Sequence, residues 1–496
     1  MTQNIFDLDD PRENYALYRL ANWIHINTRP EVIRRQLLFE TGEPVSVRLI
    51  EETERLLRAS NYLYDVSIQP IAYRDGVADI EVTTRDTWSI DLGISVSREG
   101  GENKGRLSVK EDNLLGSGIA LGISYSSDVD RSGTTFELAD RNILGTRGAA
   151  VYSHANYDDG NIQSLSLQRP FYALDARWAA GFSASESDLR DSTYNAGNVV
   201  AEYRHRRRAA EAFGGWSAGL IAGWTRRYSI GVLHQDDDYD LEPGKTAPER
   251  LPEDLTLAGP FVRFELLEDA FRTDVNLNLI GRVEDFAMGL QARLQLGRAL
   301  AELVSTRDAW LYSASVSNGY DVTKDSFLLA NVGASGRYAE HGENQSLGAA
   351  ASYYHRRGRH LVYYAALSAD AVHNPDVADP LQIGGDNGLR GYPLRYQSGE
   401  RRVLFTLEAR AYSDWYPFRL FRVGGAVFYD TGRAWKGENQ NTVNSGWLRD
   451  VGFGLRLLSA RTSKGNVLHA DFAFPLNTDD PSIKKAQFLV RTRVSF

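Results

Sequence analysis

The sequence predicts a mainly β protein, in which a transmembrane antiparallel β-barrel follows one small α+β domain. Three observations support this fold class. Aromatic residues make up 11% of the 496 residues and 44 are glycine, a composition that favours strands and tight turns. Apolar and polar residues alternate in segment after segment from residue 88 to residue 496, which is the period of a β-strand. The mean hydropathy is nevertheless −0.38, as expected for a barrel in which only alternate residues meet lipid.

The charge and residue content exclude several classes of site. The chain has 56 Lys and Arg against 65 Asp and Glu, a net charge of −9, so a general nucleic-acid interface is not expected. It has no cysteine, which excludes disulfides, zinc–thiolate sites, iron–sulfur clusters and thiol nucleophiles. No apolar run is long enough to predict a transmembrane helix. The first twenty residues lack the pattern of a secretory signal, so an exported protein would have this sequence as its mature form or without its start.

The first part of the chain reads as an N-terminal extension, 1–21, and a small domain, 22–87. A short strand is expected at Trp23 to Ile26. A helix follows, with Thr28 as its cap and Pro30 in its first turn, where a missing N–H is harmless. Gly42 is expected to end this helix.

The rest of the small domain is expected to contain a second helix and a hairpin. Ser46 is a helix cap. The segment 62–69 alternates as a strand, and Asp75-Gly76 is a hairpin turn that leads to a second strand from Val77 to Thr83. The module is either a generic α+β domain or a peptide-binding module that offers a sheet edge to extended chains.

The barrel is expected to extend over 88–496. Strands such as 405–411 recur without a linker, which argues against a β-sandwich. They run ten to fourteen residues, and ten residues tilted by about 45° cover roughly 23 Å, close to the apolar band of an outer-membrane barrel. Direct counting allows eighteen to twenty strands. The final strand has one face that ends on an aromatic residue, resembling the assembly signal of bacterial outer-membrane barrels; this face comprises Phe488, Val490, Thr492, Val494 and Phe496.

Other motifs do not predict catalysis or a metal. Residues 229–256 read as the longest loop, and its cluster of Asp236, Asp237, Asp238 and Asp240 is better explained by solvation than by calcium. Residues 215–219 match the G-x-S-x-G pattern but lie in a strand-like segment without a following helix. The histidines have no metal spacing. We therefore expect no catalytic residue, no metal, no cofactor and no enzymatic activity.

A loop and a strand carry the candidate site. The glycine-rich segment 383–392 has one arginine, Arg390, near its tip. Asp430 shares the predicted lumen face of its strand with Phe428, and Glu408 faces the same way from the preceding strand. A loop folded into the lumen would bring Arg390 against Asp430 as a bidentate pair, and breaking it would cost about 3–5 kcal/mol if it is buried. The alternative is an exposed loop arginine unrelated to Asp430.

These segments resemble the BamA/TamA-type superfamily of outer-membrane assembly and secretion proteins. The run Leu389-Arg390-Gly391-Tyr392 is similar to the family's V/L-R-G-F/Y loop motif, and the segment from Phe428 to Gly432 is similar to its F-x-D-x-G wall motif, whose Asp holds the loop Arg. Residues 22–86 resemble a POTRA domain, including the 86–88 exit into the barrel. The resemblance implies sixteen strands and an inward loop at about 373–399. BamA-like members carry several POTRA domains, whereas one is found in this sequence.

The resemblance implies an insertase or translocase that assists assembly or secretion of client proteins. The small domain would capture clients by β-augmentation, and a seam between the first strand, 88–98, and the last, 485–496, would template them. The implied location is the bacterial outer membrane, with the POTRA domain in the periplasm. The implied partners are unfolded outer-membrane or secreted clients, outer-membrane lipid and lipopolysaccharide, and an accessory periplasmic protein. Two alternatives remain open: a passive or substrate-specific channel, and a dedicated pore of the two-partner secretion type.

Overall fold

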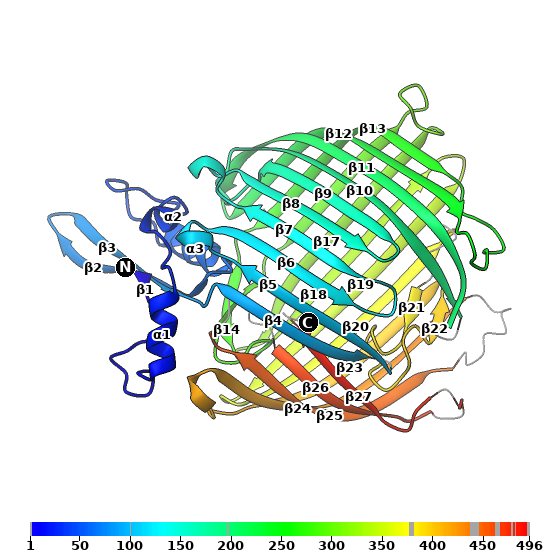
Figure 1. Cartoon of the computed structure of the whole chain (residues 1–496). Coiled ribbons are helices and arrows are strands. Elements are labelled where there is room, and N and C mark those ends of the chain that lie inside the picture. Colours follow the sequence, from blue (N-terminus) through cyan, green and yellow to red (C-terminus); the bar gives the residue numbers. More distant parts are fainter. Residues whose placement is uncertain are drawn as a thin grey trace.

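A small domain lies at one end of a large barrel-shaped sheet (Figure 1). The structure is a computed structural model, and it describes residues 2–99, 101–195, 198–375, 381–436, 446–461, 467–477, 480–481 and 483–493. None of the helices within these ranges has the length and apolar content needed to cross a lipid bilayer.

The small domain consists of a three-stranded sheet and three helices. Helix α3 begins after Ser46, whose side chain accepts a hydrogen bond from the backbone N–H of Leu49, so the predicted cap is confirmed. Asp75 and Gly76 have positive φ and form the predicted hairpin turn. Leu57 of α3 is fully buried against the sheet. The elements are β1 (Thr2–Gln3), α1 (Ala16–Ile24), α2 (Pro30–Arg34), α3 (Val47–Arg58), β2 (Leu63–Arg74) and β3 (Val77–Asp86), with the strand order β1-β3-β2.

Two predictions for the start of this domain are wrong. The expected strand at Trp23 to Ile26 is instead the end of helix α1 and the turn after it, and Trp23 is 81% exposed. Tyr18 is the buried residue of α1, and its ring stacks on Phe6 at 4.3 Å between centroids. The third strand of the sheet is β1, within the segment assigned to an extension. Tertiary packing, rather than a local alternation of three residues, decides the structure here.

Helix α2, which corresponds to the helix predicted after Thr28, is shorter than predicted, and Thr28 has another role than capping it. Helix α2 ends at Arg34 rather than at Gly42. The backbone N–H and hydroxyl of Thr28 donate to the Asp86 carboxylate at 2.7 and 3.0 Å. Asn113 of the large sheet donates to the Thr28 hydroxyl at 2.8 Å. Thr28 therefore ties the exit of the small domain to the barrel.

The large sheet is antiparallel throughout, and it contains twenty strands within the described residues. The resemblance implied sixteen, and direct counting allowed eighteen to twenty. Ten strands precede a hairpin that lies outside the sheet: β4 (Ile90–Glu99), β5 (Glu102–Glu111), β6 (Ile119–Ser127), β7 (Ser132–Asp140), β8 (Ala149–Tyr157), β9 (Gly160–Arg169), β10 (Trp178–Asn195), β11 (Asn198–Ile221), β12 (Trp224–Leu241) and β13 (Leu255–Glu268). Short 3-10 turns follow β5, β7 and β23: η1 (Leu114–Gly116), η2 (Ile143–Gly145) and η3 (Pro417–Arg419).

The second half of the sheet is interrupted by the loop that carries the candidate site. Five strands precede this loop: β16 (Gln291–Ala299), β17 (Ala309–Thr323), β18 (Ser326–Tyr338), β19 (Gly342–Arg357) and β20 (Leu361–His373). Five strands follow it: β23 (Arg401–Tyr412), β24 (Phe421–Trp435), β25 (Leu448–Ser459), β26 (Val467–Pro475) and β27 (Gln487–Arg493). Two small hairpins lie outside the large sheet: β14 (Phe271–Val275) with β15 (Val283–Ala287), and β21 (Leu381–Ile383) with β22 (Gln397–Gly399).

The first and last strands of the large sheet, β4 and β27, meet at a seam. Within the described residues, β27 and β4 share one residue pair, Val490 with Arg98, whereas β26 and β27 pair over seven. Through this pair the order of strands returns on itself. Phe488 is 42% exposed on β27. Val494 and Phe496, which we predicted to continue this face, lie outside the described residues.

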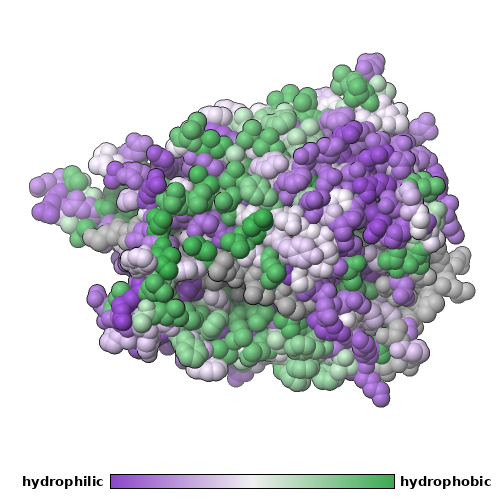
Figure 2. Space-filling model, in the orientation of Figure 1, coloured by the Kyte–Doolittle hydropathy of each residue, from purple (hydrophilic) through white to green (hydrophobic). Residues whose placement is uncertain are grey.

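The outward face of the sheet is divided into two zones. Figure 2 shows apolar residues gathered over the half nearer the small domain and hydrophilic residues over the opposite end. On β12, Ile230 and Val232 point outward in the apolar zone and are 66% and 57% exposed. An apolar band around a sheet whose strands alternate is the surface expected of a membrane-spanning barrel.

The predicted 229–256 loop is wrong over its first half. Asp236 to Asp240 belong to strand β12, where they lie opposite arginines of β11, such as Arg208 opposite Asp236. Charged side chains on neighbouring strands satisfy each other, and this pairing extends the sheet beyond the apolar zone. No group of three possible metal ligands occurs in the described residues. Ser217 of the G-x-S-x-G match is buried at the end of β11, and strand β12 follows it, as the strand interpretation predicted.

Candidate functional site in the barrel lumen

The loop between β20 and β23 is packed against the inner wall of the sheet. Its residues Ile383, Leu389 and Tyr392 are fully buried, in one cluster with Ala434 of β24 and Leu448 of β25. Gly388 has φ +106°, and a Cβ there would lie 2.3 Å from the Leu404 side chain, so only glycine fits. A Cβ on Gly432 of the wall would lie 2.5 Å from Ile383. The loop glycines and Gly432 thus allow the loop and wall backbones to approach closely.

Arg390 forms the predicted contact with Asp430. Its Nε and Nη2 donate to the two Asp430 oxygens at 2.6 and 2.9 Å, and its Nη1 donates to Glu408 at 2.7 Å. The guanidinium also lies over the Phe428 ring, 3.3 Å from its centroid. Arg390 is 1% exposed. The alternative of an exposed, unrelated arginine is therefore excluded.

The electrostatics of this site favour the charged form of the arginine. Burial alone lowers the pKa of Arg390, but Asp430 and Glu408 outweigh it and hold that pKa above the ordinary range. Removing one partner would leave a buried charge uncompensated. The contact therefore holds the loop in one position.

The cluster continues along the same wall. Arg410 donates from Nε to Glu408 at 2.8 Å, and Arg456 forms an ion pair with Asp471 of β26. The Asp471 carboxylate also lies 3.5 Å from Arg390 Nη1. Three guanidiniums and three carboxylates are thus buried together on strands β23, β24, β25 and β26 and on the loop. Of these strands β26 pairs with β27, so the cluster lies on the wall that leads to the seam.

The residues beside Arg390 make further contacts. The backbone N–H of Gly391 donates to Asp450 at 3.0 Å, and a Cβ on Gly391 would lie 2.8 Å from that Asp450 side chain. The Tyr392 hydroxyl donates to the Arg449 carbonyl at 2.9 Å. All four residues of the L-R-G-Y run are therefore buried or bonded in the wall contact. Of the predicted seam residues, Phe488 and Val490 lie on β27 and do not join this cluster.

A second lumen element was not predicted. The β14–β15 hairpin leaves the sheet after β13, and its tip residues Leu277 and Ile280 are buried among lumen side chains of β18, β19, β20, β23, β25 and β26. Arg410 donates to the Leu277 carbonyl at 2.9 Å, and the Tyr412 hydroxyl does the same at 2.9 Å. Arg410 therefore connects this hairpin to Glu408 and, through it, to Arg390. The only signal in the sequence was the ambiguous strand pattern around 257–298.

The hairpin also contacts the small domain. Arg58 of α3 donates from Nε and Nη2 to the two Asp285 oxygens at 3.0 and 2.9 Å, and Arg55 lies over the Phe271 ring at 4.0 Å. Glu284 of the hairpin is buried, and it accepts backbone N–H bonds from the tip at 2.9 to 3.2 Å. Burial raises the pKa of Glu284 to about 7. A continuous series of contacts thus connects helix α3 with the loop through the lumen.

Comparison with known proteins identifies a solved structure of similar fold. No protein-family model matches the chain, and no curated protein matches it in sequence. The structure is similar to CdiB from Escherichia coli, with 13% identity, 94% of this chain and 74% of that chain covered, and a TM-score of 0.50. BamA from Haemophilus ducreyi lacking POTRA domains 1-3 matches with 13% identity, 94% and 81% coverage, and a TM-score of 0.42. CdiB from Acinetobacter baumannii matches with 15% identity, 94% of this chain and 71% of that chain covered, and a TM-score of 0.44. The similarity to CdiB from Escherichia coli is a similarity of fold.

Proposed function

We propose that this chain is an outer-membrane barrel that inserts or translocates client proteins, with its small domain acting as a POTRA module in the periplasm. The observation that carries the proposal is the buried Arg390–Asp430–Glu408 cluster. It occurs at the loop and wall motifs through which the sequence resembles the BamA/TamA-type superfamily. The cluster would hold the loop against the wall beside the seam while the seam opens.

Two further features support client handling. Strand β2 is at the outer edge of the small sheet in the order β1-β3-β2, so its far side has no strand partner among the described residues. Such an edge accepts an extended chain by backbone hydrogen bonding. The seam offers a second edge, because β4 and β27 share one pair in the described part. Both edges would receive unfolded outer-membrane or secreted clients.

The proposed setting adds further partners and excludes others. Lipid and lipopolysaccharide would surround the apolar band, and an accessory periplasmic protein would contact the small domain. We propose no enzymatic step, no cofactor and no nucleic-acid partner, because the buried charges are explained by their role in holding the loop. The lumen holds both the loop and the hairpin, which favours a gated assembly factor over a passive channel.

The first test is client folding in liposomes. The purified protein is reconstituted, a urea-unfolded outer-membrane barrel is added, and protease-protected folded client is followed over time. We expect acceleration over empty liposomes and over liposomes with an unrelated porin, and we expect Arg390→Ala to abolish it. Arg337→Ala is the matched control, because Arg337 of β18 forms a buried pair with Glu343 of β19 at 2.8 Å, and neither residue belongs to the Arg390 cluster.

The outcomes separate the alternatives. Unchanged insertion by a folded Arg390→Ala variant would remove the loop from the mechanism. No acceleration by the unsubstituted protein, together with stable ion conductance, would favour a channel or a dedicated secretion pore.

An engineered disulfide across the seam provides a second test. The chain has no cysteine, so Arg98→Cys with Val490→Cys introduces one disulfide between directly paired residues. We expect the oxidised variant to lose insertion and to recover it on reduction. Full activity of the oxidised variant would contradict a role for the seam.

A further inference from the structure

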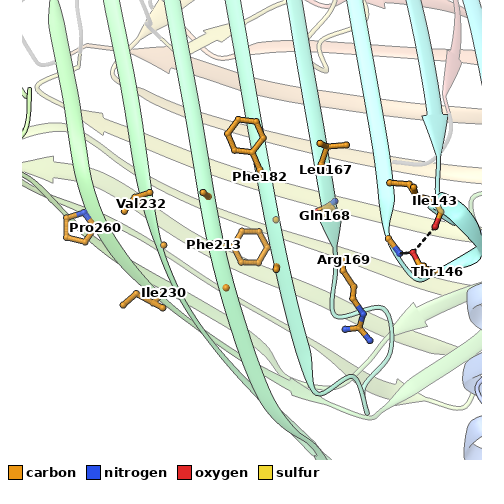
Figure 3. Close-up of a pocket in the computed structure, with 16 residues that line it drawn as sticks. Ile143, Thr146, Leu167, Gln168, Arg169, Phe182, Phe213, Ile230, Val232 and Pro260 are labelled. Atoms are coloured by element: carbon orange, nitrogen blue, oxygen red, sulfur yellow. Dashed lines mark hydrogen bonds between the residues drawn. The ribbon is translucent and has the colours of Figure 1, made fainter.

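The outward face of β9 to β13 has a shallow groove in the apolar zone. Its volume is about 780 Å³. Figure 3 shows Leu167, Phe182, Ile230, Val232 and Pro260 around it, with Arg169 at the side nearer the small domain. The groove crosses four inter-strand spacings, roughly 19 Å, which is long enough for most of a lipid acyl chain.

Small residues make the groove hollow. Outward positions on β10 and β11 are occupied by Ala180, Ala212 and Gly214, whereas the flanking strands carry larger side chains at corresponding positions. A Cβ on Gly214 would meet no atom within 4 Å. The hollow therefore results from side-chain choice and not from a distortion of the sheet.

Arg169 lines the end of the groove next to the small domain, and Arg147 lies beside it over a shared aromatic ring. Arg169 is the last residue of β9, and Arg147 is in the turn before β8. Their guanidiniums lie 5.0 and 4.6 Å from the centroid of one ring, Tyr172, and Arg169 also lies 3.8 Å from the centroid of Trp178. The Arg169 guanidinium donates a hydrogen bond to the backbone carbonyl of Trp178, and the Arg147 guanidinium donates one to the backbone carbonyl of Leu37.

Neither arginine has a carboxylate within ion-pair distance among the described residues, unlike several other outward arginines. Arg298, for example, also lies over a tryptophan, Trp310, but it forms an ion pair with Asp308 at 3.0 Å. Burial lowers the pKa of Arg147, and neighbouring Arg169 lowers it further, while Tyr172 opposes this. Two adjacent cations without an acidic partner are electrostatically suited to an anion.

We propose that this face binds one anionic glycerophospholipid, with its phosphate at Arg147 and Arg169 and an acyl chain in the groove. The aromatic rings of Tyr172 and Trp178 lie where the interfacial belt of a membrane barrel is found. An anionic lipid satisfies both halves of the site: the cations take the headgroup, and the apolar walls take the chain. The inference needs the outward face to meet lipid but does not depend on the handling of clients.

The test measures lipid retention by the whole purified protein. The probe is phosphatidylglycerol added to the protein in a neutral detergent, and bound lipid is counted by native mass spectrometry. We expect one retained phosphatidylglycerol per chain and at least tenfold weaker retention of phosphatidylcholine with the same chains. Equal retention of the two lipids would overturn the proposal.

Variants test the two halves of the site separately. The double variant Arg147→Gln with Arg169→Gln, and the groove-filling variant Gly214→Leu, should each reduce retention at least tenfold. The matched controls are Arg298→Gln, which removes an outward arginine with an acidic partner, and Gly105→Leu, which fills an exposed strand glycine with equally open space. Both controls should retain lipid normally. Heat-modifiable migration on a gel verifies that every variant is folded.

Two further outcomes would contradict the proposal. Unchanged retention by both site variants would mean that no such site exists. Displacement of the lipid by an equal concentration of inorganic phosphate, with no effect of Gly214→Leu, would indicate an anion site without a lipid. Because no client is present, these results are independent of the insertion assay.

Discussion

Two regions of the barrel contain similar ion pairs in opposite environments. The lumen cluster on β23 to β26 joins Arg390 to Asp430 and Glu408, with exposures of 2% or less for these side chains. The outward charges on β10 to β12 also pair arginines with carboxylates, such as Arg208 with Glu186, but their side chains are 59% and 43% exposed. The chemistry is the same in both regions, and the difference is access to water.

That difference decides what each region does. Water screens the outward pairs, so each is worth little and none fixes a single geometry. In the lumen, an unpaired charge has no water to solvate it, so each member of the cluster requires its partners. The lumen cluster can therefore hold a loop in place, whereas the outward pairs extend strands and keep the surface polar.

The largest effect is expected from breaking the lumen cluster. Asp430→Asn and Arg390→Ala should each lower the free energy of unfolding by about 3–5 kcal/mol, because each leaves an uncompensated buried charge. The double variant should lose little more than either single variant, since the two residues act as a pair. Urea unfolding followed by gel mobility in detergent measures this. Losses that add in full would show that the two residues are not coupled.

A smaller, pH-dependent effect is expected from Glu284 in the second lumen element. Its pKa of about 7 exceeds that of an ordinary Glu, so the folded state favours the protonated form. Below about pH 4.5 both folded and unfolded states are protonated and no cost arises. As the pH rises to about 7, the unfolded state ionises first and stability falls. Above that pH the full cost, of the order of 3 kcal/mol, remains.

Substitution by a neutral residue tests this. Glu284→Gln should gain stability relative to the unsubstituted protein as the pH rises from 5 to 8, in thermal unfolding measured at each pH. Arg337→Ala serves as a control for general destabilisation. A stability difference between the unsubstituted protein and Glu284→Gln that does not change with pH would show that Glu284 does not titrate in this range.

The smallest effect is expected from the outward pairs. Arg208→Gln should change the free energy of unfolding by less than about 1 kcal/mol, and salt should reduce the change further. The same urea unfolding at low and high ionic strength measures it. A loss as large as that of Arg390→Ala would show that exposure does not separate the two regions.

Much of this structure could be predicted from local sequence. The barrel follows from alternation, and the Ser46 cap and the 75–76 turn follow from residue chemistry. The Arg390–Asp430 contact was left open by the local pattern and was implied by the resemblance of the loop and wall motifs to a family. The errors lie where local signals are short. Trp23 to Ile26 alternate over too few residues, and Asp236 to Asp240 look like a loop until the arginines of β11 are placed opposite them.

The sequence by itself determined the alternation of apolar and polar residues, and with it a barrel, because one face of each strand must meet an apolar surface and the other must not. It also supplied the glycines of the 383–392 loop and Gly432 of the wall, which allow the two backbones to approach closely, and the charged residues of both segments. Only the tertiary structure decided which charges are buried together, that the β14–β15 hairpin occupies the lumen and reaches Arg410, and that Arg147 and Arg169 meet on one tyrosine. The physical reason is that burial and long-range pairing depend on residues far apart in the chain, which no local pattern specifies.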